Sequence, residues 1–253
     1  GKPYIDSKVE IQRAINGIKI AIEQIGLQEG HEIAMGHTAS SANRIAYTMK
    51  EPIGVVAAIS AFNHPFNLAV HQVIPAIAVG CPVIIRPATQ TPMSAIKLVE
   101  ILKEAGLPNG WAQAVVCDRN AGELLVTSPK TAFFTFIGSG PVGWYLNSKS
   151  SPGTRSALEH GGVAPVIVEP DADIEAMIPD LVKGGFYHAG QVCVSVQRIF
   201  VHESIANTVA SKIAEKASKL VVGNQLDPKT EVGPLINHNE VNRVEEWVNE
   251  AVT

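Results

Sequence analysis

Apolar residues recur along the chain with two different periods, and these periods predict its helices and strands. Between residues 7 and 28 isoleucine and alanine return every three or four positions, which is the spacing of one helix face. Short runs rich in Val, Ile and Phe indicate strands instead, because such side chains pack well on a pleated surface. Residues 44–49 and 53–60 are two such runs, and the polar break between them predicts a hairpin or a strand pair.

After residue 60 the predicted helices and strands alternate. The helices span residues 67–79, 93–104, 121–127 and 142–149, and the strands span residues 83–86, 112–116, 131–137 and 156–159. Strands separated by helices of this length form right-handed βαβ units, in which a parallel sheet is covered on both faces. The predicted fold class is therefore α/β, with a doubly wound, Rossmann-like parallel sheet.

A second α/β unit is predicted to begin near residue 161. Its elements are strand 164–168, helix 174–187, strand 198–202, helix 206–220 and a last helix from residue 239. We therefore predict one domain over residues 1–160 and another over residues 161–253. The second sheet has few strands, and Val241, Val244 and Trp247 lie on a helix face that needs a partner. The expectation is a chain that ends inside its second domain.

Composition and charge place the chain among ordinary globular proteins. Its 253 residues are 46% apolar, which allows a sizeable core divided over two modest domains. The formal net charge is -4 and the basic residues are spread along the chain, which does not favour nucleic-acid binding. Polar residues and prolines interrupt the most apolar window, residues 68–85, so no membrane span is expected.

The three cysteines, Cys81, Cys117 and Cys193, lie far apart. An odd number at these spacings fits neither a disulfide framework nor a zinc site with paired ligands, so we expect a reducing, cytoplasmic compartment and no metal. The N-terminus lacks a basic stretch followed by an apolar run, and no secretory signal is expected. The absence of an initiator methionine suggests a sequence cut from a longer one.

Three residues at separate points of the chain are candidates for catalysis. Cys193 offers a soft nucleophile and Glu159, before a Gly-Gly pair, offers a base. Asn63 follows a predicted strand, where a side-chain amide can donate to a developing oxyanion. Each has a plainer interpretation: a lone cysteine is more often an inert core residue, and asparagine is a common turn former.

Taken in order and at these spacings, the stretches around these residues resemble the aldehyde dehydrogenase superfamily. The matching stretches are Phe62-Asn63-His64-Pro65, residues 134–140, Glu159-His160-Gly161-Gly162 and Gly190-Gln191-Val192-Cys193. The resemblance implies NAD(P)-dependent oxidation of an aldehyde to a carboxylic acid, through a thiohemiacetal and a thioester on Cys193. It further implies that Asn63 and the Cys193 backbone N–H hold the oxyanion, while Glu159 activates the hydrolytic water.

The resemblance also assigns the two predicted domains and the extent of the chain. Residues 1–160 would form the cofactor-binding domain, with an oligomerisation hairpin near residues 36–54, and residues 161–253 would begin the catalytic domain. Family members are longer, so the chain is expected to be a fragment covering about the middle half of the family chain. Alone it is expected to show little activity; at full length a homo-dimer or homo-tetramer is expected.

A second functional interpretation of Glu159 comes from the glycines before it. Residues 138–143 fit G-x-G-x-x-G after a strand, and Glu159 lies near the distance at which a Rossmann acid binds the ribose hydroxyls. An exposed glutamate at a strand end is the plainest alternative. We prefer the role of base, which the resemblance implies for a glutamate followed by x-Gly-Gly. An exposed glutamate at a strand end would not need a Gly-Gly turn to swing it toward a neighbour.

The cofactor implied by the resemblance is NAD or NADP. Arg86 replaces a lysine of the family and adds a planar fork suited to phosphate. Thr89 replaces a glutamate that in many NAD-preferring members repels a 2'-phosphate, so NADP is open as well. The residues implied in cofactor binding are Ser60, Phe62, Arg86, Thr89, Phe136, Gly138, Ser139 and Val142.

The substrate implied is a small polar or anionic aldehyde. His64, Asn67 and His71 fall at or beside positions that line the family's substrate tunnel, although local hydrogen bonding explains them equally well. Gln72 replaces a lysine and removes a positive charge, which supports a rival: a catalytically silent structural or binding module of the same fold. A CoA-acylating aldehyde dehydrogenase is a further alternative, and Glu159 argues against it.

Overall fold

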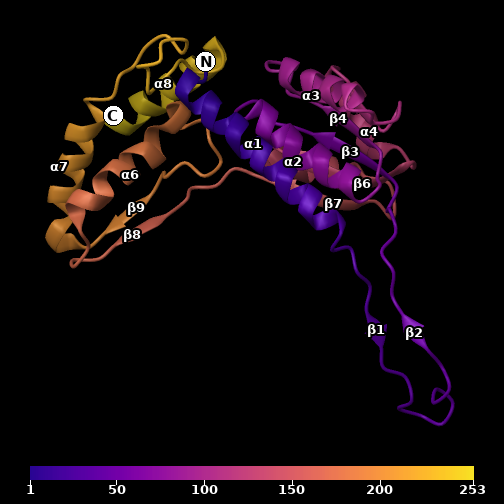
Figure 1. The fold of residues 1–253 in the computed structure, drawn as a ribbon. Helices are drawn as coiled ribbons and strands as arrows, with labels where there is room; N and C mark the ends of the chain where they lie inside the picture. The colour runs from indigo at the N-terminus through magenta and orange to yellow at the C-terminus, as the bar shows by residue number, and fades with distance from the viewer. The chain divides into compact units, whose positions relative to one another are not determined.

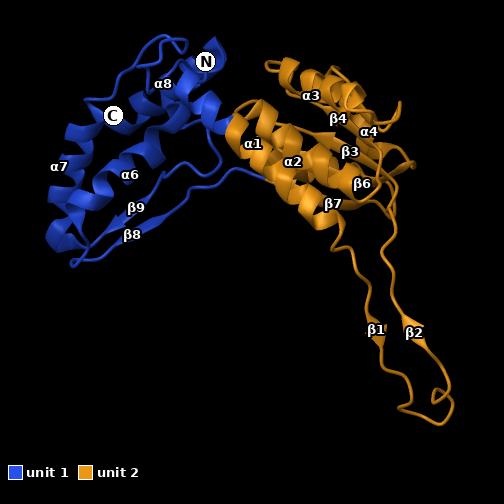
Figure 2. Cartoon of the chain, viewed as in Figure 1, with its two compact units in different colours: residues 1–10, 160–253 blue, residues 11–159 orange.

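The computed structural model describes all of residues 1–253 and divides them into two compact units (Figure 1, Figure 2). One unit is Ile11–Glu159, and the other combines Gly1–Glu10 with His160–Thr253. Residues 1–10, which the sequence placed in the first domain, thus group with the second half of the chain. That the two units act as cofactor-binding and catalytic domains stays a prediction.

The unit of residues 11–159 is built on a five-stranded parallel sheet in the order β5-β4-β3-β6-β7. The strands are β3 (Val55–Ile59), β4 (Val83–Arg86), β5 (Ala112–Ala114), β6 (Thr131–Ile137) and β7 (Arg155–Glu159). The helices between them are α2 (Pro65–Ala78), α3 (Met93–Glu104), α4 (Arg119–Thr127) and α5 (Gly140–Lys149). The predicted α/β fold with a doubly wound parallel sheet is confirmed.

The central strand β3 shows why both faces of this sheet are covered. Val56 and Ala58 belong to a core cluster shared with α2 and α3, whereas Ala57 and Ile59 belong to a second cluster with residues of α4 and α5. Successive side chains of a strand point to opposite faces, so an unbroken apolar run requires helices on both sides. From β3 the chain builds β4 and β5 on one side and then β6 and β7 on the other.

Helix α1 (Tyr4–Ile25) carries the apolar stripe predicted for residues 7–28. Within the unit of residues 11–159, Ala14 is fully buried and Ile18 and Ala21 pack against the same core as α2. The two helices are close at Gly17, where a Cβ would make an ordinary van der Waals contact of 3.8 Å with Val70 Cγ1. The stripe therefore attaches α1 to α2 on one face of the sheet.

The arm formed by β1 (Glu32–Ile33) and β2 (Ala46–Tyr47) corrects one prediction (Figure 1). These two strands pair with each other in antiparallel fashion, and β3 pairs with β4 and β6. The expected pairing of residues 44–49 with 53–60 is therefore wrong. Residues 56–59 are all buried, as in a central strand with neighbours on both sides, and such a strand is unavailable to a surface hairpin.

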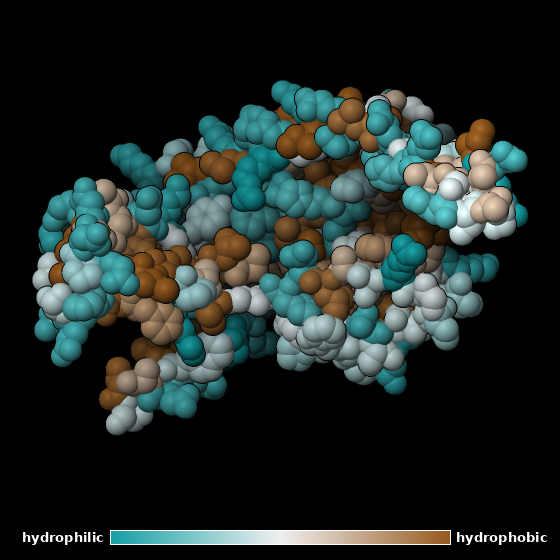
Figure 3. All heavy atoms as spheres, turned by 90° about the horizontal axis from the view of Figure 1, so that it is seen from below, coloured by the Kyte–Doolittle hydropathy of each residue, from teal (hydrophilic) through white to brown (hydrophobic).

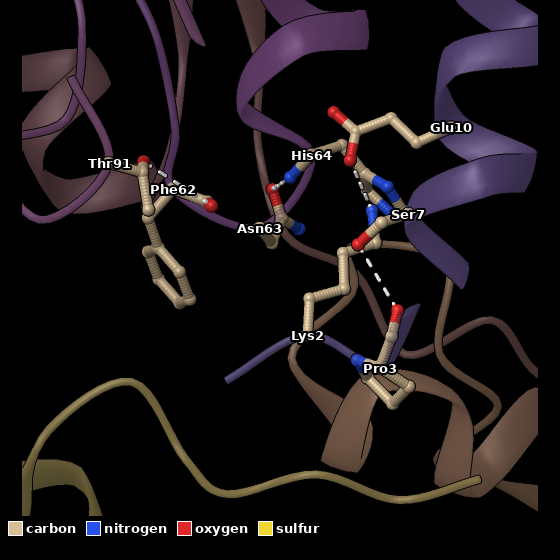
Figure 4. A network of polar contacts seen from close by, with 8 residues as sticks. All are labelled: Lys2, Pro3, Ser7, Glu10, Phe62, Asn63, His64 and Thr91. Atoms are coloured by element: carbon tan, nitrogen blue, oxygen red, sulfur yellow. Dashed lines mark hydrogen bonds and ion pairs between the residues drawn. The ribbon is translucent and has the colours of Figure 1, made fainter. Parts of the chain in front are cut away.

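The unit of residues 1–10 and 160–253, blue in Figure 2, contains a short parallel sheet and a helical layer. Its strands β8 (Val166–Val168) and β9 (Ile199–Val201) pair with each other, and Ile178, Val182 and Val209 form a core between α6 (Ile174–Phe186) and α7 (Ala206–Ala217). A tight turn (Tyr187–Gly190), a short 3₁₀ turn (Glu203–Ile205) and α8 (His238–Val252) complete it. At its N-terminal end, Lys2 Nζ lies 2.6 Å from Glu10 Oε2 in a nearly buried ion pair (Figure 4).

Apolar side chains also reach the surface, where Figure 3 shows them as brown areas among hydrophilic residues. Ile167 and Phe200, opposite each other in the β8–β9 pair, are 73% and 56% exposed. On α8, Val241, Val244 and Trp247 are partly exposed as the sequence pattern indicated. None of the helices combines the length and apolar character that crossing a membrane requires.

Candidate active site

In the unit of residues 11–159, most candidate residues lie at one edge of the sheet, at the carboxyl ends of the neighbouring strands β4, β3, β6 and β7. Ile59 lies opposite Arg86 on one side and Phe136 on the other, and Ile137 lies opposite Glu159. Neighbouring strands are about 4.8 Å apart, so the segments that follow these residues form a row. Ligands of open α/β sheets bind at this edge where the chain connections diverge, which here is between β3 and β6.

Asn63 is positioned by the start of α2. Its side chain is buried, and its Oδ1 accepts a hydrogen bond of 3.0 Å from the backbone N–H of His64 (Figure 4). Pro65 then begins the helix with its fixed φ. Phe62, one residue before Asn63, has its carbonyl near the Thr91 hydroxyl at 3.5 Å.

Gln72 ties β3 to β6 at the point where the connections diverge. Its Nε2 lies 3.2 Å from the carbonyl of Ile59 and 3.2 Å from both the carbonyl and the hydroxyl of Thr135. The side chain is buried. The sequence indicated only the loss of a positive charge at this position, whereas the structure gives the amide a bridging contact between two strands.

The glycine turn after β6 has no room for a side chain. A Cβ on Gly138 would lie 2.7 Å from Phe136 Cζ, and the Gly138 N–H donates to the Glu159 carbonyl at 3.0 Å. Ser139 is exposed at the N-cap of α5, and its hydroxyl makes no capping bond. Val142 is exposed in the first turn of α5. The turn thus presents a helix N-terminus, which favours a phosphate.

Arg86 lies flat against the first turns of α4. Its Nη2 donates to the Cys117 carbonyl at 3.1 Å, and a Cβ on Gly122 would lie 2.8 Å from Arg86 Cδ. Arg86 Nε is buried without a hydrogen-bond partner, and so is the hydroxyl of Ser60 at the end of β3. Thr89 is exposed in the loop that follows Arg86.

These features of the sheet edge fit a dinucleotide. Two unsatisfied buried donors, a glycine turn that a Cβ would fill and a helix N-terminus supply the polar contacts that a pyrophosphate and a ribose require. An unsatisfied buried donor costs free energy unless a ligand or water accepts from it.

Cys193 belongs to the other unit, in a tight turn between two buried residues. The Ser195 N–H donates to the Val192 carbonyl at 3.0 Å, and Val192 and Ser195 are 8% and 3% exposed. Cys193 and Val194 between them are exposed, whereas Cys81 is buried and Cys117 partly buried. In the same unit, a Cβ on Gly162 would lie 3.6 Å from the Cys193 carbonyl. The turn therefore presents the cysteine outward beside the Gly-Gly pair.

The backbone before this turn is in an uncommon conformation. His188, Ala189 and Gly190 have φ angles of 49°, 55° and 72°, which are in the left-handed region. Two of these residues carry a Cβ, and such strain persists only where surrounding contacts fix it. This strain has no sequence pattern that would predict it, because only Gly190 is a residue that favours positive φ angles.

The predicted substrate residues follow one another along one face of α2. His64 and Asn67 are buried at its start, and His71 lies one turn further on. Although part of the His71 ring is exposed, partial burial lowers its pKa, and the positive charge of Arg13 lowers it further. The negative charge of Glu159 opposes this shift. Arg13, on α1, is a neighbour of the site that the sequence did not reveal.

This charge arrangement gives a prediction for the titration of His71. Arg13→Gln should raise the His71 pKa, whereas Glu159→Gln should lower it, because the first change removes a positive charge and the second a negative one. The measurement is an NMR titration of the histidine ring protons in both variants. Lys19→Gln, which removes an exposed positive charge from α1, the helix that carries Arg13, serves as the control. A shift of the same sign in both variants would contradict the arrangement.

Residues 1–253 match the model of the aldehyde dehydrogenase family over their whole length. The chain belongs to this family. It is 43% identical over 254 residues to a 3-sulfolactaldehyde dehydrogenase from Priestia aryabhattai, an alignment that covers 100% of this chain and 53% of that relative. The chain thus spans about half the length of the relatives it matches.

Solved structures of aldehyde dehydrogenases have the same fold. A glyceraldehyde-3-phosphate dehydrogenase from Methanocaldococcus jannaschii, in complex with NADP, superposes with a TM-score of 0.93 at 37% identity, over 100% of this chain and 55% of that one. Aldehyde dehydrogenase 21 from Physcomitrella patens, in complex with the product succinate, gives a TM-score of 0.95 at 36% identity, over 100% and 53%.

Proposed function

We propose that the protein carrying this chain oxidises a small polar or anionic aldehyde to its carboxylic acid, with NAD or NADP as hydride acceptor. The observation that carries the proposal is the turn that holds the exposed Cys193 between the buried Val192 and Ser195. Such a turn presents a thiol to a substrate, whereas an inert cysteine would be packed away. Membership of the family and the sheet edge that fits a dinucleotide support the same reaction.

The proposed reaction begins with a covalent bond to the protein. The Cys193 thiolate attacks the aldehyde carbon, a C–S bond forms, and the former carbonyl oxygen becomes an oxyanion. The Asn63 side-chain NH₂ and the Cys193 backbone N–H donate to this oxyanion. NAD or NADP, when bound, would supply the acceptor for the hydride that leaves the same carbon, and a thioester would remain on Cys193.

Glu159 is proposed to complete the cycle as a general base. It takes a proton from a water molecule that attacks the thioester carbon, and the C–S bond then breaks to release the acid and the thiolate. The exposed carboxylate is three residues from Gly162, and Gly162 lies beside the Cys193 carbonyl.

For the cofactor, we infer that the sheet edge accepts NADP as well as NAD. Ser60, Phe62, Phe136, Gly138, Ser139 and Val142 would lie along the dinucleotide, and Arg86 and Thr89 would lie near the adenosine ribose. Arginine binds phosphate through its planar fork, and Thr89 brings no negative charge that would repel a 2'-phosphate. NADP bound to the relative from Methanocaldococcus jannaschii supports this inference.

For the substrate, we infer that His64, Asn67 and His71 contribute polar contacts. Arg13 acts on His71 electrostatically and adds a positive charge to that region of the unit, which suits an anionic group. The relative from Priestia aryabhattai is a 3-sulfolactaldehyde dehydrogenase, and the structure from Physcomitrella patens holds succinate. Both names refer to anionic compounds and support an anionic aldehyde here.

For the assembly, we infer a homo-dimer or homo-tetramer of the full-length protein. The β1–β2 arm carries the exposed apolar side chains of Ile45, Tyr47 and Met49, at 88%, 67% and 71% exposure. Scattered apolar residues are normal on a surface, but a gathering on one arm is typical of a protein interface.

A steady-state assay tests the proposed activity. The full-length protein is given a panel of matched aldehydes, anionic and neutral, with NAD and NADP in turn, and reduced cofactor is followed by absorbance. We expect turnover with the highest kcat/KM for an anionic aldehyde, and measurable turnover with both cofactors. Binding of cofactor without turnover on any aldehyde would favour the silent module instead, and turnover that requires CoA would favour the CoA-acylating class.

A further inference from the structure

The turn that carries Cys193 is fastened to the end of helix α6 by a serine that lies outside the recognised motif. Ser195 Oγ lies 3.2 Å from the carbonyl oxygens of both Gly184 and Gly185. The next residue, Val196, donates its N–H to the Gly184 carbonyl at 3.0 Å. Ser195 is only 3% exposed, so these are contacts of the interior.

These contacts supply hydrogen-bond donors to the C-terminal carbonyls of the helix and also hold the turn in place. The last four carbonyls of an α-helix have no partner within it, and α6 ends at Phe186. The Tyr187 N–H donates to the Lys183 carbonyl. The next two carbonyls, of Gly184 and Gly185, accept from the Ser195 hydroxyl, and that of Gly184 also accepts from the Val196 N–H. One hydroxyl hydrogen shared between two carbonyls fixes the side chain in a single orientation.

Steric fit holds the same junction together. A Cβ on Gly184 would lie 2.8 Å from Val196 Cγ2, so α6 and the segment after Cys193 are in direct contact there. On the other side of Cys193, Gln191 Nε2 donates to the His188 carbonyl at 3.1 Å, and Gln191 Oε1 accepts from the Ile236 N–H at 3.0 Å. The cysteine therefore lies between two fastened points, two residues before it and two residues after it.

We propose that Ser195 is a positioning residue, whose hydroxyl holds the Val192–Ser195 turn on α6 and so fixes the direction of the Cys193 thiol. This rests on the function proposed for Cys193. Alanine at this position removes the hydroxyl donor and leaves the partly buried Gly185 carbonyl without its hydrogen bond. The turn then samples orientations in which the sulfur does not meet the aldehyde carbon, and misplacement by about 1 Å is enough to slow a reaction by about a hundredfold.

Ser195→Ala is tested with two readouts that do not depend on each other. We expect kcat to fall about tenfold or more while the KM for cofactor changes by less than about twofold, because the cofactor contacts lie elsewhere in the chain. Hydrogen exchange of the peptide that covers residues 187–197 should accelerate about tenfold or more. The control is Ser218→Ala, which removes a similar hydroxyl at an exposed position. The Ser218 hydroxyl donates to the Glu215 carbonyl at the end of α7, at 2.8 Å.

A second variant perturbs the junction and leaves the hydroxyl in place. Gly184→Ala introduces a Cβ against Val196 and should give the same fall in kcat and the same faster exchange, whereas Gly26→Ala, which meets nothing within 4 Å, should give neither. An unchanged exchange rate in both Ser195→Ala and Gly184→Ala would overturn the anchor, and faster exchange at parental kcat would overturn the positioning role. An active Cys193→Ala variant would instead overturn the function proposed for Cys193.

Discussion

Cys193→Ala should abolish aldehyde oxidation in the full-length protein and leave cofactor binding nearly intact. The thiolate makes the covalent bond on which both later steps depend, and Cys193 is the exposed cysteine, whereas Cys81 is buried and Cys117 is partly buried. Removing the nucleophile of a covalent enzyme lowers kcat by about 10⁴-fold or more. The measurement pairs steady-state turnover with a fluorescence titration of reduced cofactor.

The matched control for this variant is Cys81→Ala, which removes a thiol from the core cluster beneath α2. It should lower stability slightly and keep turnover near the parental value, because a small buried thiol contributes packing and no chemistry. Turnover retained by Cys193→Ala, or lost equally in both variants, would contradict the assignment of Cys193 as nucleophile.

The sheet of residues 11–159 could be predicted from the sequence, because the patterns that indicate its strands are local. The strands over residues 83–86 and 131–137 are exact, since each is an apolar run bounded by polar residues, glycine or proline. Helix α3 is exact over residues 93–104 for the same reason, with Pro92 before it and Gly106 after it. Here the local pattern and the tertiary fold agree.

The pairing in the arm and the grouping of residues 1–10 could not be predicted, because they depend on contacts between distant residues. Val55–Ile59 resembles a hairpin strand in isolation, and only the parallel register with β4 and β6 shows that it is central. Likewise, nothing in residues 1–10 indicates that they pack with the unit of residues 160–253, since α1 continues without a break past Glu10.

The candidate site divides in the same way. Asn63, Glu159 and Cys193 were found from motifs, because each lies in a short stretch with a recognisable pattern. Ser195 and Arg13 were missed, since their contacts are made with α6 and with α2, at positions about ten and nearly sixty residues away in the chain. The bridging amide of Gln72, on α2, was noticed only as a missing charge, because its partner Thr135 lies on β6, far away in the sequence.

Glu159→Gln should separate the two halves of the proposed reaction. Hydride transfer needs the thiolate and the oxyanion donors but no base at position 159, so the first turnover should release about one equivalent of reduced cofactor per site. Hydrolysis of the thioester then lacks its general base, and steady-state kcat should fall by about 10²- to 10⁴-fold. Stopped-flow absorbance measures the burst and the later rate in one experiment.

The control for this experiment is Glu104→Gln, an exposed change at the end of α3 in the same unit. It should keep the parental steady rate, which separates the loss of one particular carboxylate from a general change in surface charge. Mass spectrometry of the quenched Glu159→Gln protein should find the acyl group on the peptide that contains Cys193. A steady rate equal to that of the control would remove the base role from Glu159 and return it to ribose binding or to a structural position beside the Gly138 turn, where its carbonyl already accepts a hydrogen bond.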